Sequence, residues 1–292
     1  MIGQRDYLLR GRAMAPNVIR VQAENNDFQY IETLRRNRVK RHRAHEFVVE
    51  GVRAINGALA AGWEIAAFLY APERRLSGWA TDILAHSTAR AHLELSAPLL
   101  AKLSGKEETS ELLAVVVMPE ERLTRIPLHR NLRVVVIDRP ASPGNLGTII
   151  RSCDAFGVDG LIVSGHAVDL YDPETINATT GSLFALPIVR VGGPADLLPW
   201  LDRIRHELGT LQIVGTSAKA TLDIADHDLT RPTILAVGNE TRGLSVAYKE
   251  LCDAVVAIPI VGSASSLNVA CATSVLLYEI DRQRRRGNTA GG

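Results

Sequence analysis

Polar side chains interrupt the most apolar segment of the chain, IPIVGSASSLNVACATSVLLYE, which begins at Ile258. Ser263, Ser265, Ser266 and Asn268 stand where a buried strand is expected to pass into a buried helix. Serine and asparagine cap helix N-termini, and we expect one of the two adjacent serines, 265 or 266, to do so here. A cap uses only one of these groups. The others are therefore expected to face a ligand.

A helix predicted over residues 144–157 carries the second set of candidate groups. Asn145 is placed to cap this helix and Gly157 to end it. Gly147 and Arg151 are four residues apart on one face, so the missing side chain is expected to leave open space beside the guanidinium. Such an arginine suits a phosphate, because backbone N–H groups at a helix start attract the same anion. An ordinary surface arginine on a capped helix fits the segment equally well.

Two more loops follow predicted strands. In NETRGLS, Glu240 lies just after Gly238, where a turn lets backbone approach a ligand closely, and its carboxylate is placed to orient an arginine or an amine. The strand QIVGTSA ends in the small polar residues Thr216 and Ser217. Each loop taken alone is equally typical of a solvated surface.

The elements that must position these groups are strands of a parallel sheet. RVVVID, QIVGTSA, TILAVG and AVVAIPI alternate with helices, and their continuous apolar runs are typical of strands covered on both faces. Ligands of such sheets bind outside the carboxyl ends of the strands. The candidate groups therefore belong at one edge of the sheet, where a single cleft accounts for them more simply than unrelated loops.

A polar, proline-bearing interruption, PEERLTRIPLHRN, divides the chain into two α/β domains. The first begins with one helix through a basic run and continues with strands at FVVEG, AAFLY, AHLEL and LLAVVVM. The predicted boundaries are 1–24 for a flexible arm, 25–119 for the first domain, 120–131 for the linker, 132–286 for the second domain and 287–292 for a flexible tail.

Composition indicates a globular protein, with 292 residues, 46% hydrophobic content and a net charge of +1. No run reaches the roughly 18 apolar residues that span a bilayer, and the N-terminus lacks an apolar signal core, so a soluble, cytoplasmic protein is expected. Cys153, Cys252 and Cys271 are odd in number and widely spaced. We expect small buried residues rather than disulfides or a metal cluster.

Positive charge is concentrated in RRNRVKRHR and at the C-terminal end, where Arg282, Arg284, Arg285 and Arg286 lie. The first run contains no acid, and its cations would repel one another without a polyanionic partner, so we expect it to bind nucleic acid rather than form a solvated helix face. Its members are Arg35, Arg36, Arg38, Lys40, Arg41 and Arg43.

Missing motifs narrow the ligand. No strand is followed by GxGxxG and no GxxxxGK[ST] occurs, which argues against dinucleotide and nucleoside triphosphate sites of those kinds. No HExxH or paired-cysteine spacing supports a metal. GSASS lacks the second glycine of a GxSxG elbow, so serine hydrolysis is not favoured.

Three segments together resemble the motifs of the SpoU, or TrmH-like, family of RNA ribose 2′-O-methyltransferases in the SPOUT class. They are NLGTIIRSCDAFGVDGLIV, AVGNETRGLS and IPIVGSASSLNVACATSVLLYE. The segments LRRNRVKRHRAHEFVVEGVRAINGALAAG and AKLSGKEETSELLAVV are similar to the L30e-like, RNA substrate-binding domain that many members carry. The resemblance covers about residues 30–283.

The resemblance implies an α/β catalytic domain whose mostly parallel sheet carries a deep trefoil knot, against the usual rule that folds are unknotted. It also implies S-adenosylmethionine as cofactor, bound in the knot, and a homodimer with the active site at the subunit interface. By motif position, the cofactor would contact Gly238, Ile258 and Leu267, beside Thr216, Ser217 and Ala218. The catalytic arginine would be Arg151, surrounded by Asn145, Glu240, Ser266 and Asn268.

The implied reaction moves a methyl group from a sulfonium to a ribose hydroxyl, which is a poor nucleophile at neutral pH. A free arginine has a pKa of about 12.5 or higher and is poorly suited as a base. Our hypothesis is that an RNA phosphate receives or relays the proton with the help of Arg151, whose charge also stabilises the developing alkoxide.

Within the family, the added N-terminal domain favours a 23S ribosomal RNA substrate, and the chain as a whole resembles members that modify a uridine ribose and confer resistance to a ribosome-targeting antibiotic such as avilamycin. Transfer RNA remains an alternative substrate. The same scaffold is also compatible with methylation of a base nitrogen, or with an RNA-binding protein that has no catalytic activity.

Overall fold

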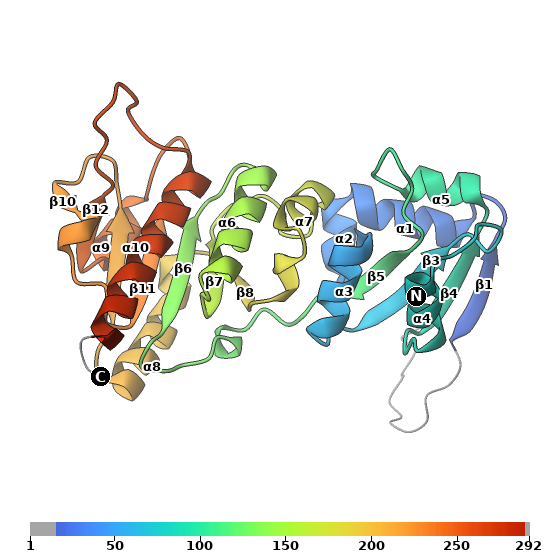
Figure 1. Ribbon diagram of the computed structural model, residues 1–292, viewed down its shortest axis with the longest axis horizontal. Helices are drawn as coiled ribbons and strands as arrows, with labels where there is room; N and C mark the ends of the chain where they lie inside the picture. Colours follow the sequence, from blue (N-terminus) through green and yellow to red (C-terminus); the bar gives the residue numbers. More distant parts are fainter. Residues whose placement is uncertain (1–15, 290–292) are drawn as a thin grey trace.

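The computed structural model describes residues 16–289, which form two α/β domains side by side in an elongated molecule (Figure 1). The first domain has a five-stranded sheet in the order β1-β4-β3-β5-β2. Its strand β5 is antiparallel to β2 and β3, and the other pairs are parallel. The strands are β1 (Asn17–Val21), β2 (Glu46–Glu50), β3 (Ile65–Tyr70), β4 (Ala91–Leu95) and β5 (Leu113–Val117). The helices between β2 and β5 are α3 (Val52–Ala60), α4 (Gly78–Ala85) and α5 (Ala97–Leu103).

Strand β1 shows that the predicted flexible arm is wrong for part of its length. Asn17 pairs with Ala91 and Val21 with Leu95, so this strand forms the edge of the first sheet. Its outer residues are exposed and only Val21 is fully buried, which left little periodicity in the sequence to predict it. Residues 1–15 of the predicted arm lie outside the described part of the chain.

The basic run forms two helices instead of the single predicted helix. These are α1 (Asn26–Arg36) and α2 (Arg38–Ala44). Asn37 between them has an extended backbone, and its Oδ1 accepts a hydrogen bond from the N–H of Lys40 at 3.0 Å. One asparagine therefore ends the first helix and caps the second.

The second domain has a seven-stranded sheet in the order β10-β12-β9-β11-β6-β7-β8, and every pair in it is parallel. The predicted parallel sheet is confirmed. Its strands are β6 (Arg133–Asp138), β7 (Gly160–Ser164), β8 (Ile188–Val191), β9 (Gln212–Thr216), β10 (Leu222–Asp223), β11 (Thr233–Val237) and β12 (Ala254–Ala257). The short edge strands β8 and β10 were not predicted.

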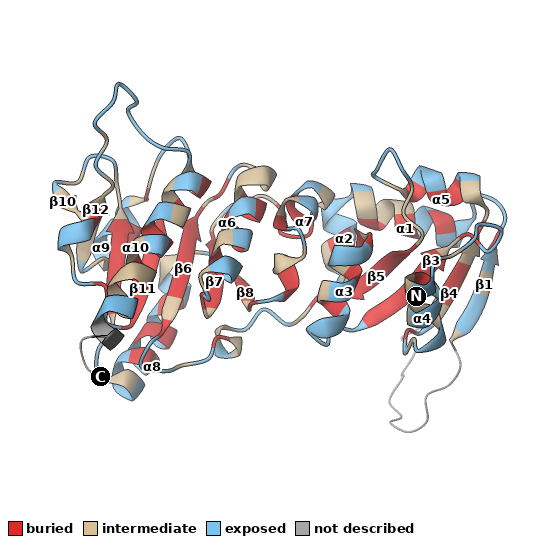
Figure 2. Cartoon of the chain, in the orientation of Figure 1, coloured by how far each residue is buried: buried red, intermediate tan, exposed pale blue. Residues whose placement is uncertain are grey.

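Helices cover both faces of this sheet. One face packs on α6 (Pro143–Ala155), α7 (Pro173–Thr179) and α10 (Val269–Thr289), and the other on α8 (Leu198–Leu208) and α9 (Val246–Leu251). The central strands are accordingly buried along their length (Figure 2). Helix α7 was not predicted, and α10 extends through residues 287–289 of the predicted tail.

The segment between the domains, residues 118–132, contains the short 3-10 helix η1 (Leu123–Arg125) as its regular element. In Figure 1 it runs along one side of the molecule, while α2 and α3 of the first domain face α7 of the second. Within residues 16–289, no helix is both long and apolar enough to cross a membrane.

Candidate active site

The four strands that precede the candidate groups are neighbours, in the order β12-β9-β11-β6. Because they are parallel, their carboxyl ends meet at one edge of the sheet, as the sequence predicts. The loops after them carry the predicted cofactor-binding and catalytic residues. The long loop of residues 258–268 rises from this edge between β12 and α10 (Figure 1).

Three of the predicted catalytic residues are joined in one hydrogen-bonded chain. The amide of Asn145 donates from Nδ2 to Glu240 Oε1 at 3.2 Å. Its Oδ1 accepts from Asn268 Nδ2 at 3.1 Å. These side chains come from α6, from the loop after β11 and from the start of α10, so Asn145 links three loops of the sheet edge.

Glu240 orients backbone rather than an arginine or amine. Its carboxylate accepts from the N–H groups of Ala141 at 3.1 Å and Ser142 at 3.3 Å, as well as from Asn145. These amides lie just before α6, so the side chain holds the β6–α6 loop against the loop after β11. Glu240 therefore does not orient an arginine or an amine, as the loop sequence predicted, although it lies beside Asn145 at the predicted sheet edge.

The helix caps are also different from those predicted. Ser142 caps α6 by accepting from the N–H of Asn145 at 3.3 Å, which leaves the Asn145 side chain free to face the loops. Asn268 Oδ1 accepts from the N–H groups of Ala270 at 2.9 Å and Cys271 at 3.3 Å, so Asn268 caps α10 instead of the predicted serines. Gly157 follows Phe156, the C-cap residue of α6, and has φ of +60°, so it ends the helix as expected.

Arg151 is exposed on α6, and its side chain forms no hydrogen bond or ion pair with another described residue. It lies six residues after Asn145, or about 9 Å further along the helix axis. Gly147 does not leave open space beside it. A Cβ there would lie 2.6 Å from Thr175 O and 2.5 Å from Ala178 Cβ, because α7 packs directly on this glycine. The prediction of a gap at Gly147 is wrong, since the unpredicted helix α7 fills it.

The loop of residues 258–268 is exposed over most of its length (Figure 2). Between Pro259 and Leu267, none of its backbone or side-chain groups, including Ser266, has a hydrogen bond to another described residue. Ile258 packs at the edge of the hydrophobic core, whereas Leu267 is 42% exposed. The loop therefore offers free N–H and C=O groups between two apolar side chains, and Asn268 fixes its end.

The other predicted cofactor residues line the same edge. Thr216 closes β9, and the N–H of Ser217 donates to Val256 O at 3.0 Å, which leads the chain through Ala218 into the next turn. A Cβ at Gly238 would overlap the backbone of Gly243 and Leu244. The glycine is thus needed for the loop after β11 to fold back on itself.

An ion pair at the carboxyl end of β6 was not predicted from the sequence. Asp138 ends β6 and is 3% exposed, and both its oxygens accept from Arg139 at 2.9 Å. Asp138 also accepts from the N–H of Ser245 at 2.8 Å, so it fixes the loop that carries Glu240. Arg139 has φ of +55°, a conformation that non-glycine residues seldom adopt. Charged residues at the end of a buried strand were the available signal.

The predicted RNA-binding residues have different environments. Arg36, Arg38, Lys40 and Arg43 are exposed. Arg35 is mostly buried, 3.9 Å from Glu50 across the ion pair, and desolvation by burial lowers its pKa. Arg41 is only 2% exposed and pairs with Asp169 of the second domain, so the prediction that it grips RNA is inconsistent with its burial.

The C-terminal arginines are likewise not one free basic patch. Arg284 donates to the carbonyl oxygens of Leu229, Asn131 and Arg231 at 3.1, 2.6 and 2.7 Å and so ties α10 to the starts of β6 and β11. Burial lowers the pKa of Arg284 to about 10. Arg282 forms a hydrogen-bonded ion pair with Glu279.

The cysteines are separate, and the described residues contain no group of three or more His, Cys, Asp or Glu side chains placed to hold a metal. Cys153 is buried as expected and Cys252 is half-buried, but Cys271 is exposed in the first turn of α10. The expectation of burial is therefore wrong for Cys271.

Comparison with known protein families agrees with this geometry. Residues 132–278 match the SpoU rRNA Methylase family, and residues 25–114 match the SpoU L30e-like domain. A 23S rRNA (uridine(2479)-2′-O)-methyltransferase of Streptomyces viridochromogenes is 47% identical over 277 residues, which are 94% of this chain and 96% of the relative. The Bacillus subtilis 23S rRNA (guanosine(2553)-2′-O)-methyltransferase RlmP is 29% identical and covers 82% of this chain and 90% of its own.

Solved structures with cofactor show the same fold. The SpoU methyltransferase AviRb from Streptomyces viridochromogenes in complex with AdoMet has a TM-score of 0.85 and 47% identity, covering 89% of this chain and 98% of its own. An AdoMet-bound rRNA methyltransferase from Sinorhizobium meliloti has a TM-score of 0.81 and 30% identity, covering 91% and 98%. The predicted family is confirmed: the chain belongs to the SpoU rRNA methylase family, with the SPOUT fold and the N-terminal L30e-like domain that the sequence predicts.

Proposed function

We propose that this protein transfers a methyl group from S-adenosylmethionine to the 2′-hydroxyl of a uridine ribose in 23S ribosomal RNA. The observation that carries the proposal is the match to the Streptomyces viridochromogenes uridine 2′-O-methyltransferase, which is 47% identical and extends over both domains. The arrangement of residues at the sheet edge supports it, because the loops named by the family motifs converge there.

The residues at the sheet edge fit the cofactor. Unpaired backbone groups of residues 259–267 can hydrogen-bond an adenosine, and Ile258 and Leu267 can pack against its base. Gly238 keeps the neighbouring loop tight, and Thr216, Ser217 and Ala218 lie on the adjacent strand end. S-adenosylmethionine supplies an activated methyl group when bound. The protein's task is to align a ribose hydroxyl with it and to help the hydroxyl proton leave.

Arg151 is the candidate for that task. It is an exposed cation without a partner among the described residues, on the helix whose first turn carries Asn145. A free guanidinium can hold an RNA phosphate by two N–H groups, so that this phosphate receives or relays the hydroxyl proton, and its charge can stabilise the developing alkoxide on the ribose. We assign Asn145, Glu240 and Asn268 to holding the surrounding loops and Ser266 to facing the ribose.

The exposed cations of the first domain are the proposed RNA-binding groups. Arg36, Arg38, Lys40 and Arg43 present positive charge on α1 and α2, whereas Arg41 takes no part in RNA contact. Backbone phosphates would provide affinity, and the shape of the RNA and its unpaired bases would provide specificity.

A second copy of the chain is the proposed partner of the exposed face of α10. Val275 is 42% exposed and Tyr278 50%, and Leu267 and Cys271 continue this apolar stripe toward the cofactor loop. The ring of Tyr278 also lies 6.5 Å from that of Phe156 at the end of α6. A two-fold contact here would bury the stripe and place the active site at the interface.

The test is to incubate the protein with methyl-labelled S-adenosylmethionine and either 23S ribosomal RNA or transfer RNA, and to map the label by nuclease-resistant ribose methylation. We expect incorporation into one 23S uridine and into no transfer RNA. Incorporation only into transfer RNA would make transfer RNA the substrate, and an alkali-labile linkage at the labelled nucleotide would contradict a 2′-O product. No incorporation into any RNA would favour a non-catalytic RNA-binding protein. Light scattering of the same preparation should give the mass of a dimer.

The proposed physiological role is cytoplasmic modification of ribosomes that lowers their affinity for an antibiotic such as avilamycin. A 2′-O-methyl group removes a hydroxyl donor and adds bulk at the drug site. Expression in a sensitive bacterium should raise the inhibitory concentration of avilamycin, and an Arg151→Ala variant should not. Equal sensitivity with and without the active enzyme would restrict the role to ribosome maintenance.

A further inference from the structure

The two domains share one hydrophobic core instead of meeting across an open hinge. The ring centroid of Phe47 in β2 lies 4.6 Å from that of Tyr171, in the loop before α7. The ring centroids of Trp63 and Phe184 are 4.9 Å apart. Phe47, Tyr171 and Phe184 are each at most 4% exposed. A dry, close-packed contact of this kind resists rotation of one domain against the other.

Glycines bring the two backbones into direct contact at this junction. A Cβ at Gly57 of α3 would lie 3.0 Å from Phe184 Cδ2 and 3.1 Å from Gly181 O. Gly181 itself has φ of +104°, and a Cβ there would lie 3.2 Å from Arg53 O. Helix α3 therefore packs closely against the backbone at Gly181 and the ring of Phe184.

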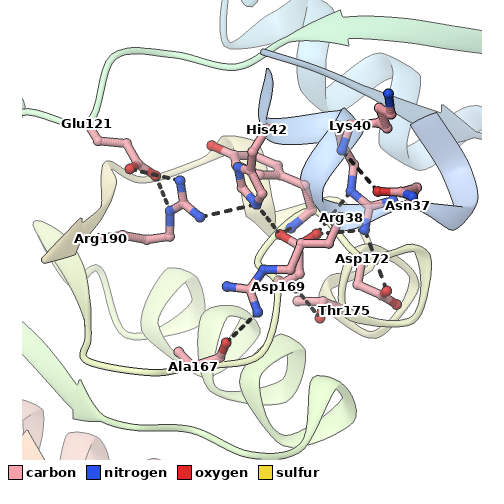
Figure 3. Close-up of polar contacts among 12 residues, drawn as sticks. Asn37, Arg38, Lys40, His42, Glu121, Ala167, Asp169, Asp172, Thr175 and Arg190 are labelled. Atoms are coloured by element: carbon pink, nitrogen blue, oxygen red, sulfur yellow. Dashed lines mark hydrogen bonds and ion pairs between the residues drawn. The ribbon is translucent and has the colours of Figure 1, made fainter. Parts of the chain in front are cut away.

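A buried ion cluster closes the rim of this contact (Figure 3). Arg41 donates from Nε at 3.0 Å and from Nη2 at 2.6 Å to Asp169 Oδ2, and the two side chains are 2% and 5% exposed. Its Nη1 donates to the carbonyl oxygens of Leu34 at 2.6 Å and Arg35 at 2.8 Å, in the last turn of α1. One guanidinium thus joins α1, α2 and the second domain.

Asp169 is fully engaged in return. Its Oδ1 accepts from the N–H of Tyr171 at 3.1 Å and lies 2.9 Å from His42 Nε2. Burial raises the pKa of Asp169, but hydrogen bonds from His42 and Arg41 and the charge of Arg41 outweigh it and hold the pKa well below its usual range. The carboxylate is therefore charged in the folded protein and bound from both sides of the junction.

The linker is pinned at the same place. Glu121, between β5 and β6, forms a two-pronged ion pair with Arg190 of β8, with one N–H···O distance of 3.0 Å. Arg190 Nη1 also lies 3.1 Å from His42 Nε2. Nearby, Arg38 donates to Ala167 O at 2.8 Å. Figure 3 shows these groups gathered around Asp169.

The cluster continues by direct contact to the helix of the proposed active site. Thr175 of α7 donates from Oγ1 to Asp169 O at 3.0 Å. The same helix packs on Gly147 of α6, where Thr175 O would be 2.6 Å from an added Cβ. Helix α6 carries Asn145 and Arg151. The position of Asp169 therefore affects how α2 packs on the second domain and, through α7, how α6 is positioned.

We propose that the Arg41–Asp169 cluster is a positioning clamp that holds the RNA-binding domain at a fixed distance and angle from Arg151. The inference rests on the proposed function and extends it to how substrate is measured. When RNA is held on the exposed cations of α1 and α2, only a ribose at one fixed distance from that bound segment would reach the methyl-transfer site. Asp169 and Arg41 act through other residues and do not touch substrate.

The test replaces Asp169 by Asn, which keeps the volume and removes the charge that balances Arg41. Spin labels attached through a genetically encoded ketone amino acid at Thr81 of α4 and Asp202 of α8 report the distance between the domains by pulsed electron resonance. We expect a narrow distribution in the otherwise unaltered protein and a broad one in Asp169→Asn. We also expect KM for 23S RNA to rise at least about tenfold, with kcat changed less and S-adenosylmethionine affinity kept, because RNA that must contact both domains binds more weakly when their spacing is no longer fixed.

A milder pair of variants keeps the test decisive if Asp169→Asn does not fold. Glu121→Gln breaks the linker contact with Arg190, and Glu120→Gln changes the adjacent exposed residue, which pairs with Arg122 in its own segment. We expect a broader distribution and a raised KM only for Glu121→Gln. The clamp would be overturned if Asp169→Asn kept both the parent's narrow distance distribution and its KM. If only Glu121→Gln folds, the same result in that variant would overturn it. A broad distance distribution in the parent would also overturn it. Failure of the parent to methylate RNA would remove the proposed function but leave the distance measurement valid.

Discussion

The interdomain junction and the strand-end loop of residues 258–268 are opposite kinds of region. At the junction, the polar groups of Arg41 and Asp169 are buried and bound to one another and to backbone carbonyl and N–H groups. In the loop, residues 259–267 are exposed except for the half-buried Ile260, and their N–H and C=O groups are without hydrogen bonds to other described residues. The hydrogen-bonding groups of Arg41 and Asp169 are paired within the chain, whereas those of the loop remain available to a ligand.

The difference indicates a division of labour. Unpaired backbone groups are tolerated in an exposed loop because water can bind them, and a ligand can later replace that water. A buried charge is not accessible to water, so other groups of the folded protein must supply its hydrogen-bond and ion-pair partners. The junction can therefore fix geometry, whereas the loop and Arg151 can bind and react. Variants of each region should fail in different ways.

The largest effect is expected for Arg151, on the open side of this comparison. Arg151→Ala should lower the rate of methyl transfer by about 10³-fold or more, because it removes charge stabilisation at the reacting oxygen. Arg151→Lys should also lose most activity, since an ammonium cannot present two parallel N–H groups to a phosphate. S-adenosylmethionine affinity, measured by calorimetry, should stay nearly unchanged in both.

Arg203→Ala provides the matched control, because Arg203 is an exposed helical arginine of α8 that pairs within its own helix with Glu207. Its turnover should equal that of the parent. Near-normal turnover in Arg151→Ala would show that the catalytic assignment is wrong and would leave the open region as a binding site only.

The open region was also the more predictable of the two. Small polar residues after β-branched runs are a local signal, and parallel strands bring such loops to one edge, so Asn145, Glu240 and Asn268 could be placed together from the sequence. Their exact hydrogen bonds could not, because Ser142 and Asn268 compete with their neighbours as caps. The gap expected at Gly147 failed because α7, a short helix with weak periodicity, was not predicted.

The junction could not be predicted from local pattern. Arg41 stands in a run of cations that reads as one charged surface, and its partner Asp169 is 128 residues further along the chain. Only the fold shows that one cation of the run faces inward and supplies hydrogen bonds to the end of α1. A charge run therefore predicts the surface well and its exceptions poorly.

The buried arginine of the basic run should contribute far more to stability than the exposed cations do. Arg41→Ala leaves Asp169 buried without its main partner and should lower the free energy of unfolding by about 3–5 kcal/mol. Replacing exposed Lys40 by Ala should change it by no more than about 0.5 kcal/mol. Urea unfolding of the two variants measures both values. Equal stability of the two would mean that the junction does not depend on the ion pair.

The exposed cations of α1 and α2 should account for part of the affinity for RNA. Neutralising Arg36, Lys40 and Arg43 together should weaken RNA binding and lower the slope of log affinity against log salt by about two to three units, because each phosphate contact releases about 0.7 to 0.9 of a counterion. Filter binding at several salt concentrations measures this slope. An unchanged slope would show that α1 and α2 present a solvated face, and the clamp would then have no RNA to position.

The smallest effect is the acid dependence of the junction. The pKa of Asp169 is lower in the folded protein than in the unfolded chain, so the stability that its charge contributes is present above about pH 4 and declines as the pH falls further. Asp169→Asn cannot titrate at this position, whereas every other carboxylate titrates in both proteins. The difference between their thermal unfolding midpoints should therefore shrink progressively as the pH falls below about 4. A difference that stayed constant down to pH 3 would mean that the Asp169 carboxylate contributes its volume and shape to the junction, not its charge.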